Sequence, residues 1–192
     1  MSEDRALRSI LKHFNVSAGE LYLGGRTLRS VSDDVGTPFF IYDLSVAQEK
    51  YNSLRNALPE GVETYYAVKA NPHREVVSFF VGLGVGFDVS SERELDFVLD
   101  AGANPDKVAF AGPGKSEGEI SRAVAAGIGS LNVESVAELD LADRLAASKG
   151  TRLDVCLRLN PNLNVRGRGL RLGGEASQFG IDQEAIPEIL RG

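Results

Sequence analysis

The sequence predicts an α/β fold of the (β/α)8 TIM-barrel type, with about five βα units present and an N-terminal β segment before them. Two observations predict this fold. Short apolar runs return at an even spacing, and helix-capping patterns lie between them. Strands that helices and a barrel interior cover on both faces are apolar throughout, which matches the character of these runs.

Five apolar runs are expected to form the parallel strands. Their first residues are 21 to 23 residues apart, which is room for one strand, one helix and two short connections. The runs are TYYAVK from Thr64, VGFDV from Val85, KVAF from Lys107, SLNV from Ser130 and LDVCLRL from Leu153.

Helix signals fill the intervals between these runs. Three intervals carry Ser-x-x-Glu, a capping box in which the serine and the glutamate bind each other's backbone N–H groups. Each of these helices is followed by a glycine suited to end it. The boxes begin at Ser91, Ser116 and Ser135, and the glycines are Gly102, Gly127 and Gly150. Two further helices are expected in HREVVSFF, after Pro72, and in IDQEAIPEIL near the end.

A parallel sheet with right-handed crossovers is either doubly wound or closed into a barrel. A doubly wound sheet carries its phosphate-binding glycines directly after its first strand. Gly82, Gly84 and Gly86 precede a strand instead, and we interpret them as a helix stop and a turn. The even repeat therefore favours the barrel. A closed barrel needs eight strands and the sixth would begin near Gly192, so we expect a partial barrel.

The region before Thr64 lacks the repeat. Residues 1–36 are expected to form an N-terminal helix and β segment, and residues 37–192 the partial barrel. ELYLGGRTL, residues 20–28, reads as a strand, a glycine turn and a second strand. We expect FFIYD, residues 39–43, to be another strand, and Ser45 to cap a helix that runs to about Leu58.

The composition excludes several classes of protein. The net charge of −6 argues against a general nucleic-acid binder. A single cysteine, Cys156, rules out an intrachain disulfide, and its place within LDVCLRL predicts a buried side chain. Two histidines without a matching cluster argue against a metal site. There is no apolar run of about 18 residues and no signal-peptide core, which predicts a cytoplasmic protein.

Ionisable and polar side chains lie at the C-terminal ends of four of the five predicted strands. They are Lys69, Asp88, Glu134, and Arg158 with Asn160. Functional groups of a barrel sit at the C-terminal ends of its strands. A lysine at an apolar barrel rim loses solvation, which lowers its pKa and provides the neutral amine that attacks a carbonyl. The alternative is a lysine whose amine reaches into solvent.

Two glycine-rich stretches lie on the same expected face. Gly112 to Lys115, GPGK, lacks the full P-loop pattern and reads as a strand-to-helix turn, with Lys115 adding positive potential. NLNVRGRGLRLGG, from Asn162, suits a lid or substrate loop. RNA binding is a rival interpretation that the acidic chain weakens. The arginines of this stretch are Arg166, Arg168 and Arg171.

Several motifs carry a resemblance to a known family. YAVKANP, at Tyr66, resembles the lysine motif of the fold-type III pyridoxal-phosphate decarboxylases, the group of diaminopimelate, ornithine and arginine decarboxylases. GFDVSSERELDFVLDAG resembles their second-strand motif and FAGPGKSEGEI their third, and LNVESVAEL, LRLNPN and SQFGI follow in the family's order. Alanine racemases share the fold and a KAN-type motif, but Pro72-His73 favours the decarboxylases. GLRLGGEASQFGID is most similar to an exosortase-associated subgroup.

The resemblance implies pyridoxal 5′-phosphate as cofactor and decarboxylation of a diaminopimelate-like amino acid. It implies that Lys69 forms the Schiff base with the cofactor, that Asp88 lies beside Lys69, and that Arg158 lies near the cofactor ring. It also implies a homodimer and a separate β-domain that the N-terminal strand joins.

The resemblance places several of the family's functional elements at positions after Gly192. They are the histidine that stacks on the cofactor, the phosphate site and the acid that faces the pyridine nitrogen. We therefore hypothesise that this chain is an N-terminal fragment or one piece of a split enzyme, inactive or barely active without a C-terminal half. Two alternatives remain open: an amino-acid racemase on the same fold, and a non-catalytic protein that binds pyridoxal phosphate or a partner.

Overall fold

The computed structural model describes residues 15–161 and 179–191. The chain divides into two compact units, residues 1–62 and residues 63–192, and each is described by itself. The expected domain boundary after residue 36 remains a prediction.

The first unit contains a small antiparallel sheet. β1 (Asn15–Ser17), β2 (Glu20–Leu23) and β3 (Arg26–Thr27) pair in that order. The sheet confirms the two strands predicted in residues 20–28, with Gly24 and Gly25 in left-handed backbone at the turn. Thr27 then caps α2 (Leu28–Val35) by accepting a hydrogen bond from the backbone N–H of Ser30.

Two local predictions for this unit are wrong. Residues 39–43 form no strand, because within residues 15–161 and 179–191 this extended segment pairs with no other strand. α3 (Leu44–Ala57) is capped by Asp43, not by Ser45. The Asp43 carboxylate accepts hydrogen bonds from both the backbone and the hydroxyl of Ser45, and these bonds lower the pKa of Asp43.

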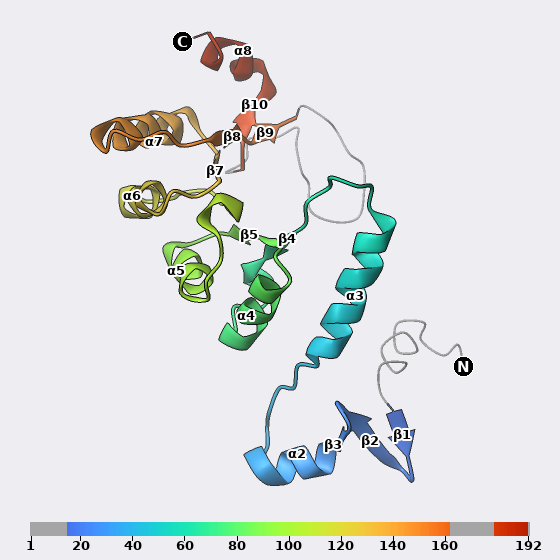
Figure 1. Cartoon of the computed structure of the whole chain (residues 1–192). Coiled ribbons are helices and arrows are strands. Elements are labelled where there is room, and N and C mark those ends of the chain that lie inside the picture. Colours follow the sequence, from blue (N-terminus) through green and yellow to red (C-terminus); the bar gives the residue numbers. More distant parts are fainter. Residues whose placement is uncertain (1–14, 162–178, 192) are drawn as a thin grey trace. The chain divides into compact units, whose positions relative to one another are not determined.

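The second unit is built on a five-stranded parallel sheet whose spatial order follows the sequence order. Its strands are β4 (Tyr65–Ala67), β5 (Gly86–Val89), β6 (Val108–Phe110), β7 (Ser130–Val133) and β8 (Val155–Leu157). The helices between them are α4 (Arg74–Gly82), α5 (Glu92–Asp100), α6 (Glu117–Ala126) and α7 (Val136–Ser148). Figure 1 shows these helices along one side of the sheet. Sequential neighbours joined by helices are the arrangement of a (β/α) barrel, which confirms the predicted fold class.

The two faces of this sheet differ in character. Alternate residues of a strand point to opposite faces. In-register residues on the helix-covered face are apolar and almost fully buried: Phe87, Val89, Val108, Phe110 and Leu131. The alternate set, on the face that would line a barrel, includes Asp88, Asn132 and Cys156.

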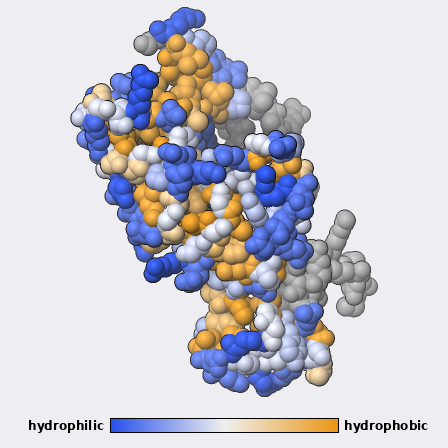
Figure 2. Space-filling model, viewed as in Figure 1, coloured by the Kyte–Doolittle hydropathy of each residue, from blue (hydrophilic) through white to orange (hydrophobic). Residues whose placement is uncertain are grey.

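The prediction that Cys156 is buried is wrong, because its side chain is exposed. Cys156 pairs in register with Asn132 and lies on the barrel-lining face. The apolar run LDVCLRL signalled a strand correctly, but the helices cover only the other face of β8. Figure 2 shows the apolar patches that remain between polar residues on the viewed surface; exposed apolar side chains of this unit include Val136, Val155, Leu159 and Leu190.

Serines cap the three helices at the predicted positions. Ser91, Ser116 and Ser135 each accept a hydrogen bond from the backbone N–H of the third helical residue. Only Ser116 forms the reciprocal box, in which Glu119 accepts from the Ser116 backbone N–H, a bond that lowers the pKa of Glu119. The other two glutamates bind the backbone one residue earlier, at Ser90 and at Glu134.

The described chain ends with a separate two-stranded sheet and a short helix. β9 (Leu159–Asn160) directly follows β8, and β10 (Ile181–Asp182) pairs with it in parallel. The predicted helix over IDQEAIPEIL is therefore wrong at its start. The 3-10 turn Gln183–Ala185 and α8 (Ile186–Ile189) follow the strand. Ile181 and Asp182 are strand because a distant segment, β9, offers them backbone partners.

Gly129, directly before β7, lies where the fold leaves no room for a side chain. A Cβ atom built on Gly129 would lie 2.0 Å from the carbonyl oxygen of Asp106. The Gly129 backbone N–H also donates to the Pro105 carbonyl, at 2.9 Å, so the two segments cannot separate without losing that bond.

We expect Gly129→Ala to destabilise the protein by roughly 1–3 kcal/mol, the scale of overpacking. Thermal or urea unfolding measures the change. Gly118→Ala is the matched control, because a Cβ there meets only the Ser116 hydroxyl, at 4.0 Å, within helix α6. Equal stability of the two variants would show that the chain near Asp106 moves aside freely.

None of the helices in the described part of the chain combines the length and apolar character that a membrane span requires.

Candidate functional site

Lys69 and Asp88 meet at the carboxyl ends of neighbouring strands. Lys69 lies in a 3-10 turn (Val68–Ala70) immediately after β4, so the strand is shorter than the predicted run TYYAVK. Asp88 lies in β5, in register with Ala67. The Lys69 Nζ is 3.6 Å from Asp88 Oδ2. The sequence analysis placed these two residues beside each other, and the structure brings them together.

The described residues leave the Lys69 side chain 63% exposed and that of Asp88 28% exposed. The amine is therefore accessible to a ligand from the barrel-lining side. The sequence analysis expected the Lys69 amine to lose solvation at an apolar rim, and the described residues do not bury it.

Sequence reasoning missed how the turn after Lys69 is held. The Tyr66 ring stacks on Phe80, with centroids 3.9 Å apart, and its hydroxyl donates to the Asn71 carbonyl. Burial raises the pKa of Tyr66, so the phenol stays a donor. The Asn71 side chain accepts from the His73 backbone N–H, and His73 caps α4 by accepting from Glu75. The sequence signal was the Asn-Pro pair, which favours a turn.

Arg158 and Glu134 form the second pair, at the ends of β8 and β7. Arg158 Nη1 donates to Glu134 Oε1 at 3.0 Å. The Glu134 side chain is 4% exposed and that of Arg158 40% exposed. The guanidinium carbon of Arg158 lies 4.7 Å from the centroid of the Phe179 ring. Arg158 is therefore fixed on one side and open to solvent on another.

Lys115 points into the protein. Its side chain is 2% exposed, and Nζ donates to the carbonyls of Gly112 and Asn132 and to Glu138 Oε1. An ammonium group has three donors, so none remains for a ligand. The expectation that Lys115 adds positive potential for a ligand is therefore wrong. The GPGK stretch is a strand-to-helix turn as predicted, with Gly112 and Gly114 at positive φ.

Arg166, Arg168 and Arg171 lie outside the described residues, and their predicted place in a lid or substrate loop remains a prediction. Asn160 donates to Asp182 and so ties β9 to β10. The structure thus forms two cation–carboxylate pairs at the same edge of the sheet, Lys69 with Asp88 and Arg158 with Glu134.

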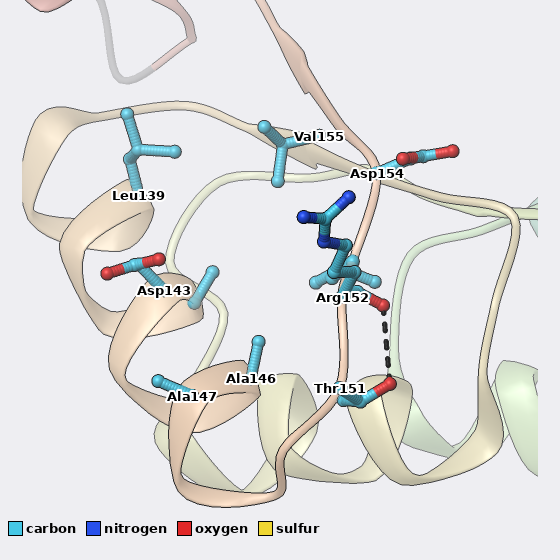
Figure 3. Close-up of a pocket in the computed structure, with 10 residues that line it drawn as sticks. Leu139, Asp143, Ala146, Ala147, Thr151, Arg152, Asp154 and Val155 are labelled. Atoms are coloured by element: carbon cyan, nitrogen blue, oxygen red, sulfur yellow. Dashed lines mark hydrogen bonds between the residues drawn. The ribbon is translucent and has the colours of Figure 1, made fainter.

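A hollow elsewhere on the second unit is not part of this site. It lies between residues 139–147 of α7 and residues 151–155, which lead into β8 (Figure 3). This is the amino-terminal end of β8, whereas the two pairs lie at the carboxyl ends of the strands. Conserved chemistry of barrels is found at the carboxyl ends, and the amino-terminal face serves stability.

Comparison with known proteins gives the family. Residues 44–191 match the family described as pyridoxal-dependent decarboxylase, pyridoxal binding domain. The chain belongs to this family. The match contains both cation–carboxylate pairs and confirms the resemblance found in the sequence motifs; the exosortase-associated subgroup remains a prediction.

Individual relatives agree with the family. The chain is 33% identical over 178 residues to the diaminopimelate decarboxylase of Aquifex aeolicus, covering 90% of this chain and 42% of that protein. It is 35% identical over 170 residues to that of Pseudomonas aeruginosa, covering 88% and 41%. The chain thus spans about two fifths of the length of these relatives.

A solved structure supports the barrel. The diaminopimelate decarboxylase of M. jannaschii, in complex with L-lysine, superposes with a TM-score of 0.84 at 27% identity. The superposition covers 93% of this chain and 44% of that one.

The residues of this member of the pyridoxal-binding family fit its cofactor. Pyridoxal phosphate is an aldehyde that carries a phosphate, so it needs a reachable primary amine and positive charge. Lys69 supplies an exposed amine at the barrel-lining edge, and Arg158 supplies an exposed guanidinium at the same edge. Asp88 supplies a carboxylate directed at the amine.

Proposed function

We propose that the protein takes part in the pyridoxal-phosphate-dependent decarboxylation of an amino acid, with Lys69 as the residue that holds the cofactor covalently. The single observation that carries the proposal is the Lys69 amine at the end of β4, exposed and 3.6 Å from the Asp88 carboxylate, within a pyridoxal-binding family match.

Each residue has a distinct part. When bound, pyridoxal phosphate supplies an electron sink for the electron pair that remains after carbon dioxide leaves. The Asp88 carboxylate attracts the Lys69 ammonium across 3.6 Å and so keeps its Nζ at the barrel-lining edge. The exposed Lys69 amine, held in this position, would be the group that transfers a proton at the reacting carbon. Arg158 adds a fixed positive charge that attracts the anionic cofactor and the substrate carboxylate.

The substrate proposed is meso-diaminopimelate or a similar amino acid with charges at both ends. The relatives named above are diaminopimelate decarboxylases, which supports this choice. Arg166, Arg168 and Arg171 are proposed to contact the distal carboxylate. The protein is also proposed to act as a homodimer in the cytoplasm.

Carbon dioxide release tests this function. The protein is expressed from its complete reading frame and supplied with pyridoxal phosphate and, separately, meso-diaminopimelate, L-lysine, L-ornithine or L-arginine. We expect release from meso-diaminopimelate above all others. Inversion at the α-carbon without carbon dioxide would establish a racemase instead, and cofactor binding without either reaction would establish a non-catalytic protein.

A further inference from the structure

Glu134 holds an unusual position for a carboxylate. Its side chain is 4% exposed at the end of β7, and a buried carboxylate needs hydrogen bonds on both oxygens to offset its lost hydration. The structure supplies them. Oε1 accepts from the Gly112 backbone N–H at 3.2 Å and from Arg158 Nη1 at 3.0 Å. Oε2 accepts from the Gly180 backbone N–H at 2.9 Å.

The three donors come from three separate parts of the chain. Gly112 lies in the turn after β6, Arg158 follows β8, and Gly180 precedes β10. One side chain at the end of β7 therefore joins the segments that follow β6 and β8 to the start of β10. Such a junction restricts the relative motion of the segments that it joins.

Gly180 is shaped for this contact. It has φ of +82°, and a Cβ atom there would lie 2.8 Å from the Arg158 carbonyl oxygen. The Ile181 N–H donates to that same carbonyl at 2.7 Å. Only glycine can bring its N–H to Glu134 while the chain passes so close to Arg158.

Glu134 is itself held in place. Its backbone N–H donates to Glu138 Oε2 at 2.6 Å, and Glu138 Oε1 accepts from the buried Lys115 ammonium at 2.8 Å. Glu138 is the third residue of α7, where a capping box would direct its carboxylate to Ser135. The carboxylate reaches one residue farther back instead, so the base of the Glu134 side chain is anchored.

We propose that Glu134 is a positioning residue for Arg158. It holds one edge of the guanidinium, leaves the exposed part directed toward the barrel-lining side, and anchors the returning chain at Gly180. The inference rests on the proposed function for what Arg158 contacts, but the hydrogen bonds to Gly112 and Gly180 do not depend on any ligand.

Glu134→Gln is the informative variant, because it keeps the shape of the side chain and removes its charge. We expect pyridoxal phosphate affinity, measured by titration of the bound chromophore, to fall about tenfold, since a hydrogen bond between ions becomes a weaker neutral–ion bond. In an Arg158→Met background the same change is expected to lower affinity by less than about twofold, because its effect acts through Arg158. Asp96→Asn is the matched control: Asp96 binds Arg122 at 2.8 Å on the exposed surface between α5 and α6.

Hydrogen exchange separates this inference from the proposed function. In Glu134→Gln the side-chain NH2 can take the place of Oε2, and an NH2 group cannot accept the Gly180 hydrogen bond. The Gly180 amide is therefore expected to exchange at least about tenfold faster, with no cofactor present. Full additivity of the two substitutions on affinity, or unchanged exchange at Gly180, would overturn the positioning role. Absence of cofactor binding in the unaltered protein would defeat the proposed function, and the exchange result alone would then decide whether Glu134 anchors this edge.

Discussion

Lys69→Ala is expected to abolish covalent capture of pyridoxal phosphate and to lower any decarboxylation by roughly a thousandfold or more, the scale found when a covalent catalytic group is removed. The reason is that the exposed Lys69 amine lies at the carboxyl end of β4 beside Asp88. Borohydride reduction of the mixture, followed by peptide mass spectrometry, measures the adduct directly and needs no turnover.

A matched control exists in the same sheet. Lys107 Nζ lies 3.6 Å from Glu63 Oε1, the same separation as in the Lys69–Asp88 pair, and it is also exposed. Lys107→Ala is expected to leave adduct formation unchanged, since it precedes β6 and so lies at the opposite end of the sheet. An adduct of equal yield in Lys69→Ala would assign capture to another lysine and reject the role proposed here.

The repeating unit was readable from the sequence because its signals are local. Apolar runs of strand length and Ser-x-x-Glu patterns involve residues within one turn or one strand of each other. All three capping serines and the order of the five parallel strands are therefore confirmed. That Asp88 lies beside Lys69 was implied by the family resemblance, and consecutive parallel strands, which place their carboxyl ends side by side, explain why the structure brings the two together.

The errors arise where distant segments decide the outcome. Ile181–Asp182 looks helical in sequence, but β9 supplies backbone partners and makes it a strand. Residues 39–43 look like a strand, but strand structure needs a neighbour, and the described residues offer none. Cys156 lies in an apolar run, yet its exposure depends on which face of β8 the helices cover.

The hydrogen-bond partners of the polar residues at the strand ends were also not predictable from the sequence, because they are distant in the chain. Sequence analysis identified Glu134 and Lys115 as residues on the active edge, but not their partners. Glu134 binds Gly180, 46 residues away, and Lys115 binds Glu138, 23 residues away. Charged residues next to strand ends are equally compatible with ligand binding and with internal pairing, and only the fold distinguishes the two.

Lys115→Met tests how much this internal pairing stabilises the barrel. The substitution leaves the buried Glu138 Oε1 without its ammonium partner, and breaking a buried ion pair in this way costs about 3–5 kcal/mol. We expect a fall of this size in the free energy of unfolding, measured in urea, and a Tm lower by roughly 10 °C.

Two comparison variants make the result specific to the buried pair. Lys149→Met removes an exposed lysine that donates to the Ser121 carbonyl, and it is expected to change stability by no more than about 0.5 kcal/mol. Lys115→Met with Glu138→Gln removes both charges and is expected to recover part of the loss, because the surviving amide no longer carries an uncompensated buried charge. The opposite outcome is full additivity, in which the double variant is less stable than Lys115→Met by the whole cost of Glu138→Gln alone. The two side chains would then be energetically independent, and their pair could not be what holds the turn after β6 to the end of β7.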